Sequence, residues 1–177
     1  MRNTIKQVSL LLFATFILSA CTNPEKKEAM DKETNDKEVI HKETIDMDKL
    51  TLEIQAMEDA YAAAEKAGDA DGVVAYYSDD AINYGANQEP ASGKAAIREK
   101  IAKRLAKDTL GNYNVYKIVD LFAEGNTAVE LGSWVQFDSS GKEMEHGNYL
   151  SYFQKRDGKY VCVRDMSTTT APVKSGM

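Results

Sequence analysis

The chain alternates between polar and apolar residues from position 113 to 168, YNVYKIVDLFAEGNTAVELGSWVQFDSSGKEMEHGNYLSYFQKRDGKYVCVRDMST. An alternation of period two is typical of strands with one buried face. Short runs of turn chemistry interrupt it, each with a Gly close to an Asp or Asn. The pattern predicts four strands joined as consecutive hairpins, over residues 113–123, 127–137, 144–155 and 159–168.

The residues before this region follow the period of a helix instead. One stripe at steps of four and three predicts a long first helix; its members are Leu50, Ile54, Met57, Tyr61 and Ala64. Gly68 can end this helix in the left-handed conformation, and Asp69 can cap a short second helix that runs to about Tyr77. We expect residues 78–80 to break that helix before a short strand over 81–84.

A third helix is predicted over residues 94–107, with Ser92 as its cap and Ile97 and Ile101 on its buried face. Its basic side chains alternate with Ala and Glu, which favours an ordinary solvated face; they are Lys94, Arg98, Lys100, Lys103, Arg104 and Lys107. Helices followed by hairpins indicate an α+β fold, in which three N-terminal helices pack on one face of an antiparallel sheet.

Several motifs in this region match a known family. They are residues 67–74 (AGDADGVV), 77–81 (YSDDA), 89–90 (EP), 92–99 (SGKAAIRE) and the closing hairpin 152–165. On these motifs, residues 50–170 resemble the nuclear transport factor 2-like superfamily, in particular its ketosteroid-isomerase-like and SnoaL-like branch, with a cystatin-like fold. The resemblance implies a strongly curved sheet that wraps around the first helix as a cone with one open pocket. It also implies frequent dimerisation through the outer face of the sheet.

The resemblance also implies where catalytic groups would stand. It places the family's oxyanion-binding tyrosine on Tyr61, its general base at Tyr84 or Gly85, and its protonated acid near Leu150. Neither of the last two positions holds an acid, and an apolar side chain cannot donate a hydrogen bond to a developing oxyanion. Steroid isomerisation is therefore not expected. Tyr61 also belongs to the apolar stripe of the first helix, so a pocket position and a core position are both open for it.

A different acid–base pair depends on which face of the strands lines the pocket. Side chains two residues apart share a face, so Glu130 and Trp134 point the same way. His146 and Asn148 likewise share a face of the next strand. If these even-numbered residues face inward, His146 is the natural general base beside Tyr61 and Glu130. If the odd-numbered residues face inward, the lining is apolar and Glu130 forms a solvated cross-strand pair with His146; hydropathy favours this alternative.

The predicted pocket residues are Tyr61, Tyr77, Tyr84, Trp134 and Asn148, and the catalytic candidates are Tyr61, Glu130 and His146. Asp165 is expected to form a structural ion pair with Arg164 at the end of the sheet. The chain has no phosphate-binding glycine loop, no nucleophile elbow and no paired-Cys or HExxH spacing, so neither a metal nor a cofactor is predicted. A net charge of -6 and a pI near 5.0 argue against a nucleic-acid partner.

The chain begins with a positively charged start and a run without charges over residues 8–20, which is too short to span a membrane. The run ends in LSAC at Cys21, which resembles the bacterial lipobox. This resemblance implies that residues 1–20 are a signal peptide and that Cys21 is acylated, which anchors the protein to a membrane of the bacterial cell envelope. Cys162 then has no partner in the chain, and its strand-like surroundings favour burial.

A charged segment follows the predicted signal peptide. Between residues 22 and 49 there are nine acidic residues and six lysines with few apolar side chains. Such a composition cannot bury enough surface to offset the entropy of ordering. We therefore predict a disordered tether over 21–48, one domain over 49–170 and a flexible tail over 171–177.

These observations predict an exported, lipid-anchored domain that binds a small, mostly apolar ligand without chemistry. One alternative is a SnoaL-like or isomerase-like enzyme that performs acid–base chemistry in the cone pocket. Another is an interaction module that forms a homodimer or docks a partner in the cell envelope.

Overall fold

The computed structural model describes residues 44–108 and 110–172. Cys21, the predicted signal peptide and nearly all of the predicted tether lie outside the described residues. The described residues form three helices: α1 (Met47–Lys66), α2 (Ala70–Val74) and α3 (Lys94–Leu105). The strands are β1 (Tyr77–Tyr84), β2 (Ala91–Ser92), β3 (Tyr113–Glu124), β4 (Thr127–Phe137), β5 (Glu143–Arg156) and β6 (Lys159–Ser167). No helix in the described ranges is long and apolar enough to cross a membrane.

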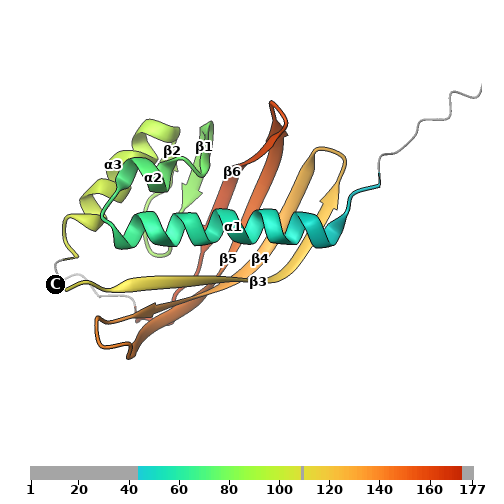
Figure 1. Cartoon of the computed structure of the whole chain (residues 1–177). Helices are drawn as coiled ribbons and strands as arrows, with labels where there is room; N and C mark the ends of the chain where they lie inside the picture. The colour runs from blue at the N-terminus through green and yellow to red at the C-terminus, as the bar shows by residue number, and fades with distance from the viewer. Residues whose placement is uncertain (1–43, 109, 173–177) are drawn as a thin grey trace, which may run out of the picture. The chain divides into compact units, whose positions relative to one another are not determined.

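The six strands form one curved sheet in the order β2-β1-β6-β5-β4-β3, and α1 lies across its concave face (Figure 1). The predicted α+β fold, a cone of curved sheet around N-terminal helices, is confirmed. All four strands predicted after residue 111 are present and differ by a residue or so at their ends. One pairing departs from the antiparallel prediction, because β1 runs parallel to β6.

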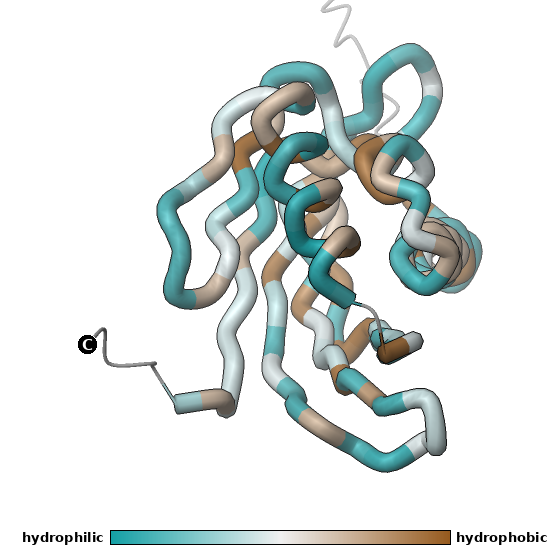
Figure 2. Tube along the Cα trace, turned by 90° about the vertical axis from the view of Figure 1, so that its left-hand side faces the viewer, coloured by the Kyte–Doolittle hydropathy of each residue, from teal (hydrophilic) through white to brown (hydrophobic). Residues whose placement is uncertain are grey.

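The first helix forms as its stripe predicts. Asp46 caps its start, and Gly68 follows its end with a φ of 70°. Leu50 and Ile54 are buried, and Tyr61 packs against the same core. Figure 2 views α1 nearly end-on. Burial of this apolar face against the sheet holds the helix in place.

Two local predictions are wrong. The second helix ends at Val74, and Tyr77 begins β1 rather than ending the helix. β1 pairs with β6 at Tyr77 and again at residues 82–84, and the register shifts between these points, so residues 78–80 form an irregular part of the strand instead of ending a helix. Ser92 does not cap α3 either: it lies in β2, and Gly93, with a φ of 84°, occupies the cap position without a side-chain hydrogen bond.

The pairing register of β4 and β5 shows that neither predicted alternative, with all even-numbered or all odd-numbered residues facing the pocket, is correct. Glu130 pairs with Ser151, and Trp134 pairs with Gly147. Directly paired residues share a face, so the concave side takes even-numbered residues from β4 and odd-numbered residues from β5. Both alternatives assumed the same parity on the two strands. Only the pairing register, which depends on tertiary contacts, decides this point.

Candidate functional site

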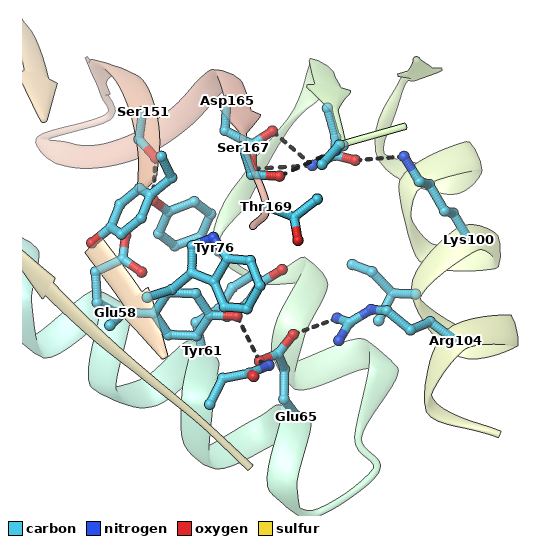
Figure 3. A pocket seen from close by; sticks show the side chains of 18 of the residues that line it. Glu58, Tyr61, Glu65, Tyr76, Lys100, Arg104, Ser151, Asp165, Ser167 and Thr169 are labelled. Carbon is cyan, nitrogen blue, oxygen red and sulfur yellow. Dashed lines mark hydrogen bonds and ion pairs between the residues drawn. The ribbon is translucent and has the colours of Figure 1, made fainter. Parts of the chain in front are cut away.

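A pocket of about 350 Å³ lies between α1, α3 and the concave face of the sheet. Cavities of this size suit small organic molecules. Figure 3 shows Glu58, Tyr61 and Glu65 of α1 on one side, with Asp165, Ser167 and Thr169 on another. Lys100 and Arg104 of α3 face them. The walls therefore combine tyrosine rings with ionisable groups, and the residues come from segments that are far apart in the chain.

Two buried glutamates form the deep part of the site. Glu58 is 3% exposed and accepts a hydrogen bond of 2.5 Å from the Tyr76 hydroxyl, which also contacts Ser151 Oγ at 3.0 Å. Glu130, behind it, accepts a 2.6 Å hydrogen bond from the Tyr149 hydroxyl. Burial, and then the nearby charge of Glu130, raise the pKa of Glu58 to about 9. Glu58 is therefore a protonated carboxylic acid at neutral pH.

Asp165 is a third carboxyl group without a direct ion pair. Its oxygens accept hydrogen bonds from the Tyr77 hydroxyl at 2.7 Å and from Asn83 Nδ2 at 2.9 Å. Burial raises the pKa of Asp165, although these two hydrogen bonds oppose the shift. The predicted ion pair with Arg164 is wrong, because Arg164 donates to the carbonyl groups of Asp80 and Val163 instead. A base in such surroundings is stronger than an exposed aspartate.

Glu65, near the C-terminal end of α1, forms an ion pair with Arg104 of α3. The Glu65 side chain is 3% exposed, and its second oxygen accepts hydrogen bonds from Asn114 Nδ2 at 2.9 Å and from the Tyr116 hydroxyl at 2.8 Å. Arg104 bonds the first oxygen through Nη2. The carboxylate of Glu65 thus has a hydrogen-bond partner for each oxygen. Of the ionisable groups in the pocket, this pair is the one best explained by a structural role.

Tyr61 contacts three other tyrosines and lies at the centre of this aromatic group. Its ring makes edge-on contacts with Tyr76, Tyr77 and Tyr116, at centroid distances of 5.3, 6.4 and 5.4 Å. Burial raises the pKa of the Tyr61 hydroxyl, so it stays protonated. The two positions that the sequence left open for Tyr61 therefore coincide: the residue packs against the core and also lines the pocket.

The structure brings some of the predicted site residues together and separates others. Tyr61, Tyr77 and Trp134 line the pocket. Tyr84 is 42% exposed, Asn148 lies on the convex face, and neither lines it, which corrects the predicted pocket. Of the catalytic candidates, Glu130 is fully buried beside the pocket and hydrogen-bonded to a residue that lines it.

His146 does not reach the pocket. It lies on the convex face of β5, where Nδ1 is 2.8 Å from Glu143 Oε1 and its side chain is 55% exposed. The predicted arrangement of His146 with Tyr61 and Glu130 is therefore absent. The parity of the β4–β5 register is the reason, since Glu130 and His146 end on opposite faces of the sheet.

Sequence reasoning missed Glu58, Glu65 and Arg104 as pocket residues. Glu58 and Glu65 precede and follow Tyr61 by three and four residues, which places all three on one helix face. The position of these two glutamates beside the apolar stripe of the helix was the sequence signal that could have indicated their burial. Arg104 and Lys100 were expected to be solvated, but both turn toward the pocket. Across residues 44–108 and 110–172, no group of three or more His, Cys, Asp or Glu could hold a metal ion.

The curved sheet around a long helix, with a pocket at its open end, defines the class of nuclear transport factor 2-like proteins with a cystatin-like fold. A model of the SnoaL-like domain family matches residues 58–163, so the chain belongs to that family. A protein of unknown function with a cystatin-like fold from Nostoc punctiforme superposes with a TM-score of 0.65 at 14% identity, over 73% of this chain and 96% of that chain.

Two further solved structures extend the comparison. A nuclear transport factor 2-like protein from Novosphingobium aromaticivorans has a TM-score of 0.61 at 20% identity, over 72% of this chain and 90% of that chain. A ketosteroid isomerase-like protein from Erwinia carotovora atroseptica has a TM-score of 0.57 at 19% identity, over 69% and 97%. At these identities the similarity establishes the fold alone.

Proposed function

We propose that this domain is an acid–base catalyst whose pocket takes a small, ring-shaped or unsaturated molecule with a carbonyl group. The observation that carries the proposal is a set of three carboxyl groups at one pocket: Glu58 and Glu130, which are buried, and Asp165, which is half-buried. Tyrosine hydroxyls and an amide hold them, and none has a direct ion pair among the described residues. Buried carboxyl groups cost free energy, and they concentrate where a shifted pKa serves a reaction.

The two carboxyl groups that line the pocket suit opposite roles. Asp165, as a carboxylate, would take a proton from the carbon next to the carbonyl group. The electron pair of that C–H bond would form a C=C bond, and the π pair of the carbonyl group would move to its oxygen. Glu58, protonated at neutral pH, would donate a hydrogen bond to the developing oxyanion. The proton would return from Asp165 to carbon, so the substrate is isomerised or exchanges its hydrogen without a co-reactant.

Hydrogen exchange tests this proposal without knowledge of the natural substrate. Cyclohexanone, acetophenone and 1-indanone are incubated with the purified protein in D₂O, and NMR measures the rate at which each ketone takes up deuterium. General base catalysis contributes about 10²- to 10⁴-fold, so acceleration of at least one ketone by about 100-fold over buffer is expected. Asp165→Asn should abolish it, whereas Asp157→Asn, the same change in an exposed turn, should not.

Binding without acceleration would overturn the catalytic proposal in favour of the ligand carrier. The ring faces around Tyr61 support this second function, because they can hold an apolar molecule regardless of the carboxyl groups. In that case wild type and Asp165→Asn would bind the same ketones with equal affinity. Absence of both binding and exchange with all three ketones would count against either function.

We also propose, from the lipobox resemblance alone, that Cys21 carries the lipid anchor. Acyl chains contribute about 0.8 kcal/mol for each buried CH₂ group, so two or more anchor a protein stably. Cells fed a labelled fatty acid should label the wild type and Cys162→Ala equally, because the Cys162 thiol is buried and inaccessible to acylation. Cys21→Ala should remain unlabelled and leave the membrane fraction. A wild-type protein without label would contradict the anchor.

A homodimer through the outer sheet face remains a further proposal. Leu131, Leu150 and Met166 are paired in register and form an apolar row across β4, β5 and β6 on the convex side. Leu131 is 40% exposed and Met166 is 50% exposed. Sedimentation should detect a dimer that Met166→Glu dissociates, while Leu52→Glu, on the exposed side of α1, leaves it intact. A wild type that stays monomeric at high concentration would exclude it.

A further inference from the structure

Two cations of α3 stand at the mouth of the pocket. Lys100 and Arg104 are separated by one helical turn, and both line the pocket (Figure 3). They come from a helix face that the sequence predicted to be solvated. The protein as a whole carries a net charge of -6, so a pair of cations beside the pocket differs in sign from the overall charge of the chain.

The hydrogen bonds of these two residues leave donors free. Arg104 bonds Glu65 through Nη2, and its Nε and Nη1 have no partner among the described residues. Lys100 Nζ donates to Asn83 Oδ1 at 2.9 Å, and its other two donors have no such partner. A guanidinium and an ammonium group with free donors can bind a carboxylate from two directions.

The backbone near Lys100 makes room for its side chain. A Cβ atom at Gly85 would lie 2.9 Å from Lys100 Nζ, so the ammonium group occupies the space that any other residue would fill. Burial lowers the pKa of Lys100, although the nearby charge of Asp165 opposes this shift. The ammonium group is thus held over the edge of the pocket rather than extended into solvent.

A second, shallower hollow of about 580 Å³ leads to the same mouth. Lys100, Arg104 and Gln88 line both hollows, and Lys103 and Lys107 add two more cations along the outer one. Glu99 also lines the outer hollow and pairs with Lys103 at 2.6 Å, so the cations remain in excess there. Clustered charges of one sign in a concave surface attract ligands of the opposite sign. The outer hollow therefore favours the approach of an anion.

The sheet side of the pocket carries an acidic group from β5. Glu145 lines it and accepts a hydrogen bond from the Thr169 hydroxyl. A negatively charged group that enters the pocket is therefore repelled from this wall and attracted to α3. The mouth is asymmetric, so it can orient a ligand as well as attract one.

We propose that the ligand is a small organic acid, whose carboxylate is bound by Lys100 and Arg104 while its neutral carbonyl end enters toward Glu58 and Asp165. The inference rests on the proposed acid–base function, to which it adds the class of substrate. A protonated Glu58 does not repel the inner end of such a molecule. The two ends of the pocket thus recognise the two ends of the ligand.

A matched pair of probes separates charge from shape. 4-Oxocyclohexane-1-carboxylate and its primary amide have the same ring and ketone, and only the first is an anion. Calorimetric titration of the full chain at pH 7 measures both affinities, and uptake of deuterium next to each ketone measures catalysis. We expect the carboxylate to bind at least 10-fold more tightly than the amide, by a margin that shrinks as salt concentration rises.

The variants assign this preference to α3. Lys100→Gln should reduce it several-fold, and the double variant Glu65→Gln/Arg104→Gln should do the same while leaving no buried charge unpaired. Lys117→Gln, an equal loss of charge on the convex face, should leave the preference unchanged. Melting temperatures of all variants identify any that fail to fold.

The outcomes are distinct for the two proposals. Equal affinity for the two probes, or no measurable binding of the carboxylate, overturns the organic acid as ligand. A preference that survives both the Lys100 and the Arg104 variants also overturns it. If the carboxylate is preferred but neither probe exchanges hydrogen, the class of ligand stands and the catalytic proposal fails.

Discussion

Gly132 of β4 lies directly beneath the ring of Tyr149 of β5. A Cβ atom on Gly132 would fall 2.0 Å from Tyr149 Cζ and 2.3 Å from its hydroxyl oxygen, far inside any contact distance. The ring can cross this position only because residue 132 has no side chain. From there its hydroxyl reaches Glu130 at 2.6 Å, so the glycine positions the partner of a buried glutamate.

Gly132→Ala should therefore displace the Tyr149 ring and leave Glu130 without its hydrogen bond. Overpacking costs about 1–3 kcal/mol, and a buried acceptor without a partner costs a similar amount. We expect the free energy of unfolding to fall by about 2–4 kcal/mol in urea titrations. Ser133→Ala, at the next position and on the convex face, should change it by less than about 0.5 kcal/mol. Equal stabilities of the two variants would contradict the close approach.

The raised pKa of Glu58 predicts that stability falls as pH rises. An unfolded glutamate loses its proton near the ordinary pKa of 4.5, whereas the folded protein keeps it until about pH 9. The folded state therefore binds the extra proton between these values, and its advantage, complete below pH 4.5, is lost as pH approaches 9. One such proton gives a slope on the order of 1 kcal/mol per pH unit.

Urea unfolding between pH 5 and pH 8.5 measures this slope. Glu58→Gln should make it shallower by about one proton, and the remaining slope comes from Glu130 and Asp165, whose pKa values are also raised by burial. Glu53→Gln, on the exposed side of the same helix, should leave the slope unchanged. A wild-type stability that is constant across this range would show that Glu58 is ionised in the folded protein.

The ion pair of Glu65 and Arg104 should behave as one unit in a double-mutant cycle. Arg104→Gln leaves the buried Glu65 carboxylate without its cation, which we expect to cost about 3 kcal/mol. In Glu65→Gln/Arg104→Gln the loss should be smaller than the sum of the single losses by about 2 kcal/mol. Chemical unfolding of the four proteins gives this coupling energy, and additive losses would mean that Arg104 does not neutralise Glu65.

The cap of α2 offers a test of local structure. Asp69 Oδ1 accepts hydrogen bonds from the backbone of Asp71 at 3.0 Å and of Gly72 at 2.9 Å. Asp69→Ala should lower the free energy of unfolding by about 1 kcal/mol, while Asp69→Asn, which can make the same bonds, should be nearly neutral. If both substitutions were equally harmful, a role other than capping would be indicated.

Much of the fold could be predicted because its signals are local. The turns with Gly125 and Gly158 lie where the strands end, and both glycines have positive φ. The stripe through Ile54 and Tyr61 correctly assigned the buried face of α1. Cys162 is fully buried, as its surroundings predicted. Each of these features depends on residues a few positions apart, so the sequence contains the whole signal.

The candidate site could be predicted only in part. Tyr61, Tyr77 and Trp134 were predicted as pocket residues, and all three line the pocket. The family resemblance pointed to Tyr61, and the even-numbered face of its strand pointed to Trp134. Asp165 was assigned to a surface ion pair, because its sequence neighbour is an arginine. Its actual partners, Tyr77 and Asn83, reach it through the parallel pairing of β1 with β6, which nothing in the local sequence indicates.

The order of helices and hairpins and the Asp69 cap of α2 are readable from the amino acids alone, since hydrophobic period and turn chemistry act over short range. The SnoaL-like identity is readable from the sequence motifs as well. The polarity of the pocket is not. It depends on the β4–β5 register, which places Glu130 and Tyr149 on the concave side of the sheet and His146 on the convex side. A shift of one residue would reverse every side chain of a strand, and only the packing of the whole sheet selects between the two.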